Sequence, residues 1–489
     1  MKRTAILDVV GLTDSLLGPA MPRLSQFAGN GAKAVIVPAF PAVTCTAQAN
    51  YLTGQPPARH GIVGNGWYNR ELAEVHFWKQ SNHLVQARKL WEELRAVDPQ
   101  LTCAQLFWWF NLHSSADYSI TPRPIYRADG RKVFDIYAWP YSLRPQIKRD
   151  LGEFPFLAFW GPAAGVDTSR AAADAASRWI AEAAKWIERQ YHPTLSLVYL
   201  PHLDYNLQRL GPRHPGIARD LRLIDAIVGD LLDFFRQQSV QVVLLSEYGL
   251  AEVDTPIHLN RLFRERGWLA VKDELGLELL DPGASRVFAV ADHQVAHIYL
   301  NDRSLERPAR DLLEGQPGVA EVLGEAEKTA AGIAHPRAGD LIAVAAERAW
   351  FTYYYWTDER RAPDFARTVD IHRKPGYDPV ELFLDPKSPA LKLRMLWRLL
   401  QKRLGFRMLM DVVPLDATLV KGSHGRRGAD PAHWPLLVAE NKDALPGAPV
   451  DSTQVHARLR HLVAGSLLSP TGGEQQGEGA MNPPIASLP

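Results

Sequence analysis

Short, continuous apolar runs recur along the chain, and they predict buried strands. These runs cover residues 3–10, 34–38, 195–200 and 240–246. Two longer segments, 172–191 and 217–235, place apolar residues at helical spacing. Continuous apolar strands are typical of parallel sheets whose two faces are both covered by helices. The alternation of strands and helices therefore predicts an α/β fold.

Carboxylates follow three of the predicted strands. Asp8, Asp204 and Glu247 each come just after an apolar run. In α/β sheets, ligands bind beyond the carboxyl ends of the strands. We therefore expect the three carboxylates to lie at one edge of the sheet.

Some regions depart from this alternation. Residues 111–165 are rich in aromatic residues and proline, which indicates an inserted cap, and residues 301–410 form a second inserted or accessory region. Within the latter, 391–410 is basic and amphipathic. It is interpreted as a helix with a solvated basic face, with a membrane-surface role as the alternative. Residues 466–489 are predicted to be a disordered tail. The remaining core comprises residues 1–110, 166–300 and 411–465.

The charge balance limits the partners. The 489 residues include 55 Lys and Arg against 54 Asp and Glu, a net charge of +1. Such a chain has no global field for a nucleic acid polymer, so none is expected as a partner. Two cysteines cannot form a disulfide scaffold and fit a reducing compartment. With a charge at Asp8 inside the first apolar run and no apolar run of 18 residues, neither a signal peptide nor a transmembrane helix is expected. The predicted location is the cytoplasm, and no oligomeric state is predicted.

The segment 38–54 has the strongest candidate nucleophile. A strand leads into a proline-containing turn, and several hydroxyl residues, Thr44 among them, follow where a helix should begin. A hydroxyl at that place can attack phosphorus, while helix N–H groups and the dipole favour phosphate. The alternative interpretation is ordinary N-capping.

Two pairs of residues near the predicted strand ends suit a cation. Asp204 and Gln208 are four residues apart, which places them on one face of a helical turn. Glu247 and Tyr248 offer a carboxylate and a phenol at the end of a strand. The alternative for the second pair is an ordinary exit from strand to loop.

Histidines appear later in the chain. Asp292 and His293 stand in a strand-like alternation, which predicts that they point to opposite faces. His372 and His424 each lie in a glycine-bearing loop with basic neighbours, Lys421 among them. Imidazole suits zinc, iron and manganese. A hydroxyl nucleophile, scattered carboxylates and late histidines on an α/β frame are together the composition of a two-metal hydrolase.

The order of these motifs resembles the type I phosphodiesterase / nucleotide pyrophosphatase family of the alkaline phosphatase superfamily. The resemblance is carried by Ile6–Asp8, Pro38–Gly54, Arg59–Tyr68, Asp204 with Gly211-Pro212, Ser246–Gly249 and Gly422–Gly425. It implies an alkaline-phosphatase-like, mixed and mostly parallel sheet sandwiched by helices, with inserted caps.

The resemblance also implies roles for single residues. Thr44 would form a phosphothreonine intermediate. Asp8, Thr44 and the pair Glu247-Tyr248 would hold one metal. Asp204 and Gln208 would hold the other with His424 or His372, and Asp292 and His293 are possible extra ligands. The residues expected to contact substrate are Asn65, Tyr68, Lys421 and Arg123.

The sequence departs from the family pattern at four places. Gln208 stands where the family usually has His, Glu247-Tyr248 where it has Asp-His, and Ala47 where it has an Asn that stabilises the phosphoryl oxygen. The late His is also not joined directly to Gly-Tyr-Asp. Fewer histidines leave a harder, oxygen-rich site, which favours Mn²⁺, Mg²⁺ or iron over Zn²⁺, or one metal instead of two. Asn50, or N–H groups near Cys45, are hypothetical substitutes for the missing oxyanion donor.

The function expected from the sequence is a metal-dependent phosphoric ester hydrolase with one or two divalent ions, Mn, Mg, Fe or Zn. Its partner would be a small organic phosphate ester or a nucleotide-like molecule. The choice of substrate would depend on contacts with the cap region, namely with Trp108, Trp109, Tyr126 and Arg123. One alternative is a hydrolase of carbon–phosphorus bonds or a phosphate or sulfate transferase of the same superfamily. The other is a degenerate, non-catalytic member that binds a phosphorylated metabolite.

Overall fold

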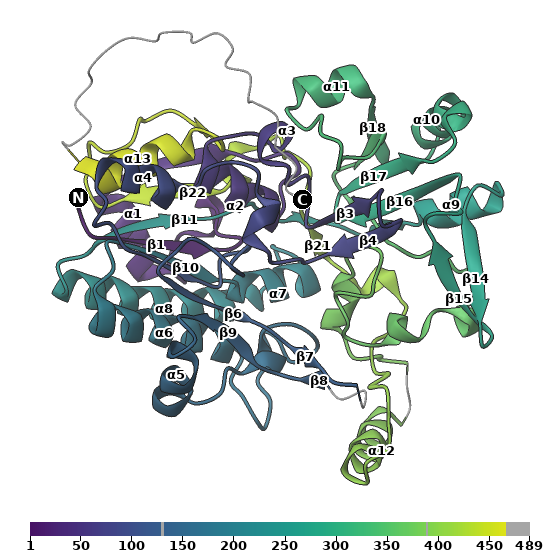
Figure 1. Cartoon of the computed structure of the whole chain (residues 1–489), viewed down its shortest axis with the longest axis horizontal. Helices are drawn as coiled ribbons and strands as arrows, with labels where there is room; N and C mark the ends of the chain where they lie inside the picture. The colour runs from purple at the N-terminus through teal and green to yellow at the C-terminus, as the bar shows by residue number, and fades with distance from the viewer. Residues whose placement is uncertain (129–131, 388–389, 466–489) are drawn as a thin grey trace, which may run out of the picture.

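A computed structural model describes residues 1–128, 132–387 and 390–465 (Figure 1). The predicted disordered tail, 466–489, lies outside the described residues. In the described part of the chain, no helix is long and apolar enough to cross a membrane. The cytoplasmic location stays a prediction.

A large twisted sheet forms the centre of the first core. Within the described residues it has nine strands in the order β23-β2-β22-β11-β1-β10-β5-β6-β9. Their bounds are β1 Thr4–Val9, β2 Ala32–Val37, β5 Cys103–Leu106, β6 Tyr118–Pro122, β9 Ile136–Trp139, β10 Leu195–Leu200, β11 Gln241–Leu245, β22 Leu436–Ala439 and β23 Val450–Asp451. The central neighbours β5, β10, β1 and β11 run parallel, whereas β22 and β9 are antiparallel to their neighbours. The prediction of a mixed, mostly parallel sheet is confirmed.

Helices cover both faces of this sheet, which explains why its central strands are largely apolar. Every residue of β1, β10 and β11 is buried. Helices α6 (Ala175–Tyr191) and α8 (Ile217–Gln237) lie on one face, and α2 (Thr44–Thr53), α4 (Leu90–Val97) and α13 (Val455–Ala464) lie on the other (Figure 1). Neither face of such a strand contacts water, so apolar and polar residues do not alternate along it.

A second, smaller sheet has its own core. It is antiparallel in the order β16-β17-β19-β18, with bounds Val287–Asp292, Val295–Leu300, Leu341–Ala345 and Val319–Leu323. Because β16 and β17 form a hairpin that pairs with β19, this core begins before residue 301. Aromatic side chains such as Phe288, Tyr299 and Trp350 fill it.

The region predicted as an inserted cap has two parts. Its strands β6 and β9 pair with each other and extend the central sheet through β5. Between them the strands β7 (Ile125–Tyr126) and β8 (Lys132–Val133) form a small hairpin that projects from the sheet (Figure 1). The region therefore both extends the central sheet and carries a projecting hairpin. The domain boundaries as a whole stay a prediction.

Candidate functional site

The three strand-end carboxylates converge at the carboxyl edge of the central sheet, as expected. Asp8 lies near the end of β1, Glu247 follows β11, and Asp204 stands on α7 (His202–Leu210), directly after β10. Thr44 is the first residue of α2 and faces the same place. All four side chains are buried. The parallel register of β10, β1 and β11 explains why residues so far apart in sequence meet.

Asp8 and Glu247 form a buried carboxyl pair. Burial and the neighbouring charge of Glu247 raise the pKa of Asp8 well above its usual value. Burial likewise raises the pKa of Glu247, although the contacts with Asp8, Thr44 and Gln48 oppose the rise. Within the described residues, Asp8 Oδ1 and Glu247 Oε2 have no hydrogen-bond partner. Two carboxyls this close need a shared proton or a cation.

The amide of Gln48 bridges this pair, a role that the sequence interpretation missed. Gln48 Nε2 donates to Glu247 Oε1 at 2.6 Å and to Asp8 Oδ2 at 3.3 Å. The backbone N–H of Trp109 donates to Gln48 Oε1 at 2.7 Å, which fixes the orientation of the amide. The available signal was spacing, because Gln48 lies four residues after Thr44 and so on the same helical face.

Asp204 is satisfied by neighbouring side chains. Gln208 Nε2 donates to Asp204 Oδ2 at 2.7 Å, and the Tyr248 phenol donates to Oδ1 at 3.3 Å. The hydroxyl of Tyr377 in turn donates to Gln208 Oε1 at 2.7 Å. Burial raises the pKa of Asp204 to about 7. The carboxylate thus has both oxygens occupied.

Tyr248 connects the nucleophile candidate to the late histidine. Its hydroxyl lies 3.2 Å from Thr44 Oγ1, and its ring stacks on His424 with centroids 3.5 Å apart. His424 Nδ1 donates to the carbonyl of Ala42 at 2.7 Å, which leaves Nε2 as the acceptor nitrogen. Burial and the neighbouring His293 lower the pKa of His424 well below its usual value, so the imidazole is neutral.

Asp292 and His293 meet, so the prediction that they point to opposite faces is wrong. Strand β16 ends at Asp292, and His293 sits in the following turn with φ of 62°, where strand alternation no longer applies. His293 Nδ1 donates to Asp292 Oδ1 at 2.7 Å. Asn65 holds the same carboxylate through its backbone N–H at 2.7 Å and its side-chain amide at 3.1 Å. Among described residues His293 Nε2 is buried without a partner.

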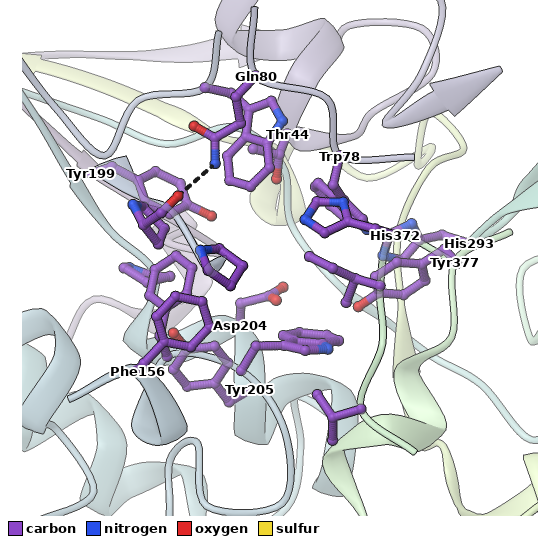
Figure 2. A pocket seen from close by; sticks show the side chains of 18 of the residues that line it. Thr44, Trp78, Gln80, Phe156, Tyr199, Asp204, Tyr205, His293, His372 and Tyr377 are labelled. Atoms are coloured by element: carbon purple, nitrogen blue, oxygen red, sulfur yellow. Dashed lines mark hydrogen bonds between the residues drawn. The ribbon is translucent and has the colours of Figure 1, made fainter. Parts of the chain in front are cut away.

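Thr44, Asp204, Tyr248, His293 and His424 border one pocket, whose space amounts to about 900 Å³ when its opening to solvent is included (Figure 2). Thr44, Asp204 and His293 face the cavity from different elements, and Tyr377 lies beside His293 (Figure 2). Its walls are largely aromatic. They include Trp78, Trp109, Phe159, Trp160, Tyr205 and, from the β7–β8 hairpin, Tyr126 with Lys132. The described residues offer no partner to two of the polar atoms there, Tyr205 hydroxyl and Trp109 Nε1.

Several predicted site residues make contacts other than the expected ones. His372 lines the pocket, but its Nδ1 lies 3.4 Å from the carbonyl of Phe77 and its ring faces Tyr126. The predicted substrate contacts that are not among the lining residues are Asn65, Tyr68, Lys421 and Arg123. Tyr68 packs against Phe288 and Tyr299 in the second core, and the ammonium of Lys421 donates to the Thr418 carbonyl. Roles for these residues in binding stay predictions.

The two suggested replacements for the missing oxyanion donor are engaged elsewhere. The Asn50 side chain lies against Ser452, at 2.9 Å, and His60, at 2.7 Å. The backbone N–H of Cys45 donates to Asn65 Oδ1 at 3.0 Å. Neither the Asn50 amide nor the Cys45 N–H is therefore free to contact a phosphoryl oxygen. Tyr248 is the donor that the structure places beside Thr44.

The donor chemistry fits a cation at one position and not at the other. Asp8 Oδ1 and Glu247 Oε2 are buried oxygens that lack a partner in the described residues, and the Thr44 hydroxyl adjoins them. This all-oxygen set suits a hard divalent ion. At Asp204, by contrast, Gln208 and Tyr248 already satisfy both oxygens. Across residues 1–128, 132–387 and 390–465, no group of three His, Cys, Asp or Glu is arranged to hold a metal ion.

Comparisons with known proteins identify the family of the chain. A family model, type I phosphodiesterase / nucleotide pyrophosphatase, matches residues 4–378. An uncharacterized pyrophosphatase/phosphodiesterase of Schizosaccharomyces pombe is 22% identical over 234 residues, which are 46% of this chain and 39% of that protein. The match therefore spans well under half of this relative.

Solved structures share the fold. Murine ectonucleotide pyrophosphatase / phosphodiesterase 5, as an inactive variant in complex with AMP, has a TM-score of 0.56 and 13% identity, with 97% of this chain and 98% of that chain covered. Phosphonoacetate hydrolase from Sinorhizobium meliloti has a TM-score of 0.58 and 16% identity, with 95% and 96% covered. Because the family model spans residues 4–378, the chain belongs to the type I phosphodiesterase / nucleotide pyrophosphatase family.

Proposed function

We propose that this protein hydrolyses a phosphoric ester of a small organic molecule and that Thr44 is the nucleophile. The observation that carries the proposal is the position of the Thr44 hydroxyl. It opens the first turn of α2, borders the aromatic pocket, and lies between Glu247 and Tyr248. A hydroxyl beside a carboxylate and a phenol at a helix N-terminus suits phosphoryl transfer.

The neighbouring groups have complementary roles in this reaction. Thr44 Oγ1 attacks phosphorus, its proton passes to Glu247, and the ester P–O bond breaks as the leaving group takes a proton from solvent. Water then hydrolyses the phosphothreonine. Burial raises the pKa of Tyr248 well above its usual value, so the phenol keeps its proton. That proton points to Asp204 Oδ1 in the structure and would turn to the phosphoryl oxygen when substrate binds. Tyr248 thereby takes over from the Asn that Ala47 replaces.

One divalent ion fits this scheme at Asp8, Glu247 and Thr44. When bound, it would lower the pKa of the Thr44 hydroxyl and offset charge on the phosphoryl group. Oxygen donors alone favour Mg²⁺ or Mn²⁺ over Zn²⁺. Asp204, Gln208 and Tyr248 then act as a hydrogen-bonded wall of the site and not as a second metal position.

The walls of the pocket indicate the kind of ester. Trp78, Trp109 and Trp160 offer flat apolar faces, and Tyr205 and Lys132 add polar contacts. Such walls accommodate a leaving group with an aromatic or apolar body. The alternative, hydrolysis of a carbon–phosphorus bond, is compatible with the likeness to phosphonoacetate hydrolase, which concerns the fold.

A second candidate function is binding without turnover. It is favoured by one observation, the occupation of Asp204 by the Gln208 amide and the Tyr248 phenol. These are the two positions at which the resemblance expects histidine ligands. A protein of this kind would bind a phosphorylated small molecule in the same pocket.

Hydrolysis of bis(p-nitrophenyl) phosphate tests the proposal. Metal-stripped protein is resupplied with Mn²⁺, Mg²⁺, Zn²⁺ or Fe²⁺, and Thr44→Ala is compared with Thr53→Ala, a control on the last turn of the same helix. We expect turnover with Mn²⁺ or Mg²⁺ that is lost in Thr44→Ala and kept in Thr53→Ala. Turnover unchanged in Thr44→Ala would overturn the proposal. Saturable binding of the ester by calorimetry, with no turnover in any metal, would favour the second candidate.

A further inference from the structure

Helix α12 (Leu391–Arg403) exposes an apolar stripe to solvent. The side chains that form the stripe are Leu393, Leu396, Trp397, Leu400 and Leu404, the last directly after the helix, and they are between 44% and 70% exposed. Their spacing of three and four residues places them along one face of the helix. Figure 1 shows α12 standing away from both sheets, at the edge of the molecule. Soluble proteins rarely leave such a row of large apolar side chains uncovered.

Basic residues accompany the stripe. Arg394, Lys402 and Arg403 of α12 are exposed, and Arg407 follows in the next segment. In the sequence, no acidic residue stands between Asp385 and Asp411, whereas seven Lys and Arg do. The helix is anchored from its other side, where Arg398 Nε and Nη2 donate to the Asp411 carboxylate at 2.9 and 3.1 Å. The apolar stripe lies on the side of the helix away from this ion pair and is exposed.

We propose that α12 and residues 404–409 bind the surface of an anionic lipid bilayer. The stripe, together with exposed Phe406 and Leu409, would enter the boundary between headgroups and acyl chains. The arginines and lysines would contact lipid phosphates beside it. A solvated basic face, the ordinary interpretation of this stretch, explains the charges but leaves the outward row of leucines and Trp397 unexplained.

The segment after α12 contacts the hairpin that borders the pocket. Arg407 Nη2 donates to the carbonyl of Ala128 at 3.0 Å, which joins the segment after α12 to the chain between β7 and β8. Tyr126 and Lys132 of that hairpin line the pocket, while Ile125 and Val133 beside them are exposed. Docking through α12 would therefore bring the rim of the pocket next to the bilayer. The proposal itself does not rest on hydrolysis of an ester.

Vesicle flotation tests this binding. The full chain is floated with vesicles of phosphatidylcholine alone and with vesicles that contain 30% phosphatidylglycerol, at about 0.1 M salt, where charges are screened beyond ~10 Å. Two double variants change only exposed side chains, Leu396→Gln/Leu400→Gln and Arg394→Glu/Arg403→Glu. The control is Leu275→Gln, a fully exposed leucine in the β14 (Ala270–Glu274) to β15 (Leu277–Asp281) turn. Sedimentation velocity without lipid reports the oligomeric state.

We expect binding to the anionic vesicles, weak binding to phosphatidylcholine, and loss of binding at high salt. Each arginine removed should lower the partition coefficient about fivefold, and the leucine variant should lower it at least tenfold. Leu275→Gln should bind as the wild type does. No flotation with anionic vesicles, or flotation that neither double variant reduces, would overturn the proposal. A dimer that the leucine variant dissociates, without flotation of the wild type, would assign the stripe to a second copy of the chain.

Discussion

Replacing Asp204 by Asn should stabilise the metal-free protein at alkaline pH. Asp204 is buried, and burial is the largest cause that raises its pKa from 3.8 to about 7. Asparagine has nearly the same shape. Its oxygen can accept from Gln208 Nε2, and its amide can donate to the Tyr248 hydroxyl, so the two contacts of Asp204 persist. The substitution therefore removes the titratable carboxyl group while the neighbouring hydrogen bonds stay nearly unchanged.

The size of the effect follows from the two pKa values. Three powers of ten in proton affinity, at about 1.4 kcal/mol each, amount to about 4 kcal/mol. Because the folded-state pKa is raised, the stability that the protonated carboxyl contributes is complete below about pH 4 and is lost as the pH rises through 7. At pH 8 the variant should exceed the wild type by about 4 kcal/mol in free energy of unfolding, and near pH 4 the two should coincide.

Urea unfolding from pH 4.5 to 8.5 in the presence of a chelator measures this difference. Asp443→Asn, a substitution of an exposed aspartate, is the control and should show no gap that depends on pH. A gap between Asp204→Asn and wild type that stays constant with pH would refute the argument. So would a variant that is less stable than the wild type at pH 8.

Stabilisation by Mn²⁺, measured on Asp204→Asn and on Glu247→Gln, shows how many cations the site binds. A ligand that binds only the folded state stabilises it by RT ln(1 + [L]/Kd). Under the one-cation proposal, Mn²⁺ should raise the free energy of unfolding of Asp204→Asn by the same amount as it raises that of the wild type. Glu247→Gln should abolish that stabilisation, because Asp8 alone remains as a carboxylate. Loss of Mn²⁺ stabilisation in Asp204→Asn would instead place a cation at Asp204.

Three further variants test the neighbouring contacts. Gln48→Leu leaves the Trp109 N–H and both carboxyls without their buried partner, so urea unfolding should show a loss of about 2–3 kcal/mol. Tyr248→Phe removes the phenol donor beside Thr44 and should lower kcat for the ester about a hundredfold with little change in KM, as steady-state kinetics would show. The double variant Gln208→His/Tyr248→His replaces the amide and phenol beside Asp204 by imidazoles. Elemental analysis should then find two zinc ions per chain in place of one cation. An unchanged number of metal ions would contradict the roles assigned to Gln208 and Tyr248.

Patterns along the sequence predicted the frame of the molecule. The apolar runs correspond to β1, β2, β10 and β11, and the amphipathic segments to α6 and α8, because burial on two faces or on one face dictates those patterns directly. The strand-end position of Asp8 and Glu247 was predictable for a similar reason. Parallel neighbouring strands end at the same edge, so polar residues after them meet there. The motif order also identified the family.

The contacts that give the site its character depended on tertiary structure. Gln48 reaches Asp8 and Glu247 only because α2 is laid across the ends of β1 and β11, and His293 reaches Asp292 because a turn with positive φ interrupts the strand. Likewise, the sequence indicated that 391–410 is amphipathic, but only the fold decided that Arg398 faces the protein and the leucine stripe faces solvent. Local patterns record how deeply a residue is buried. Which side chains meet depends on the packing of segments distant in sequence, and that packing has no local signal.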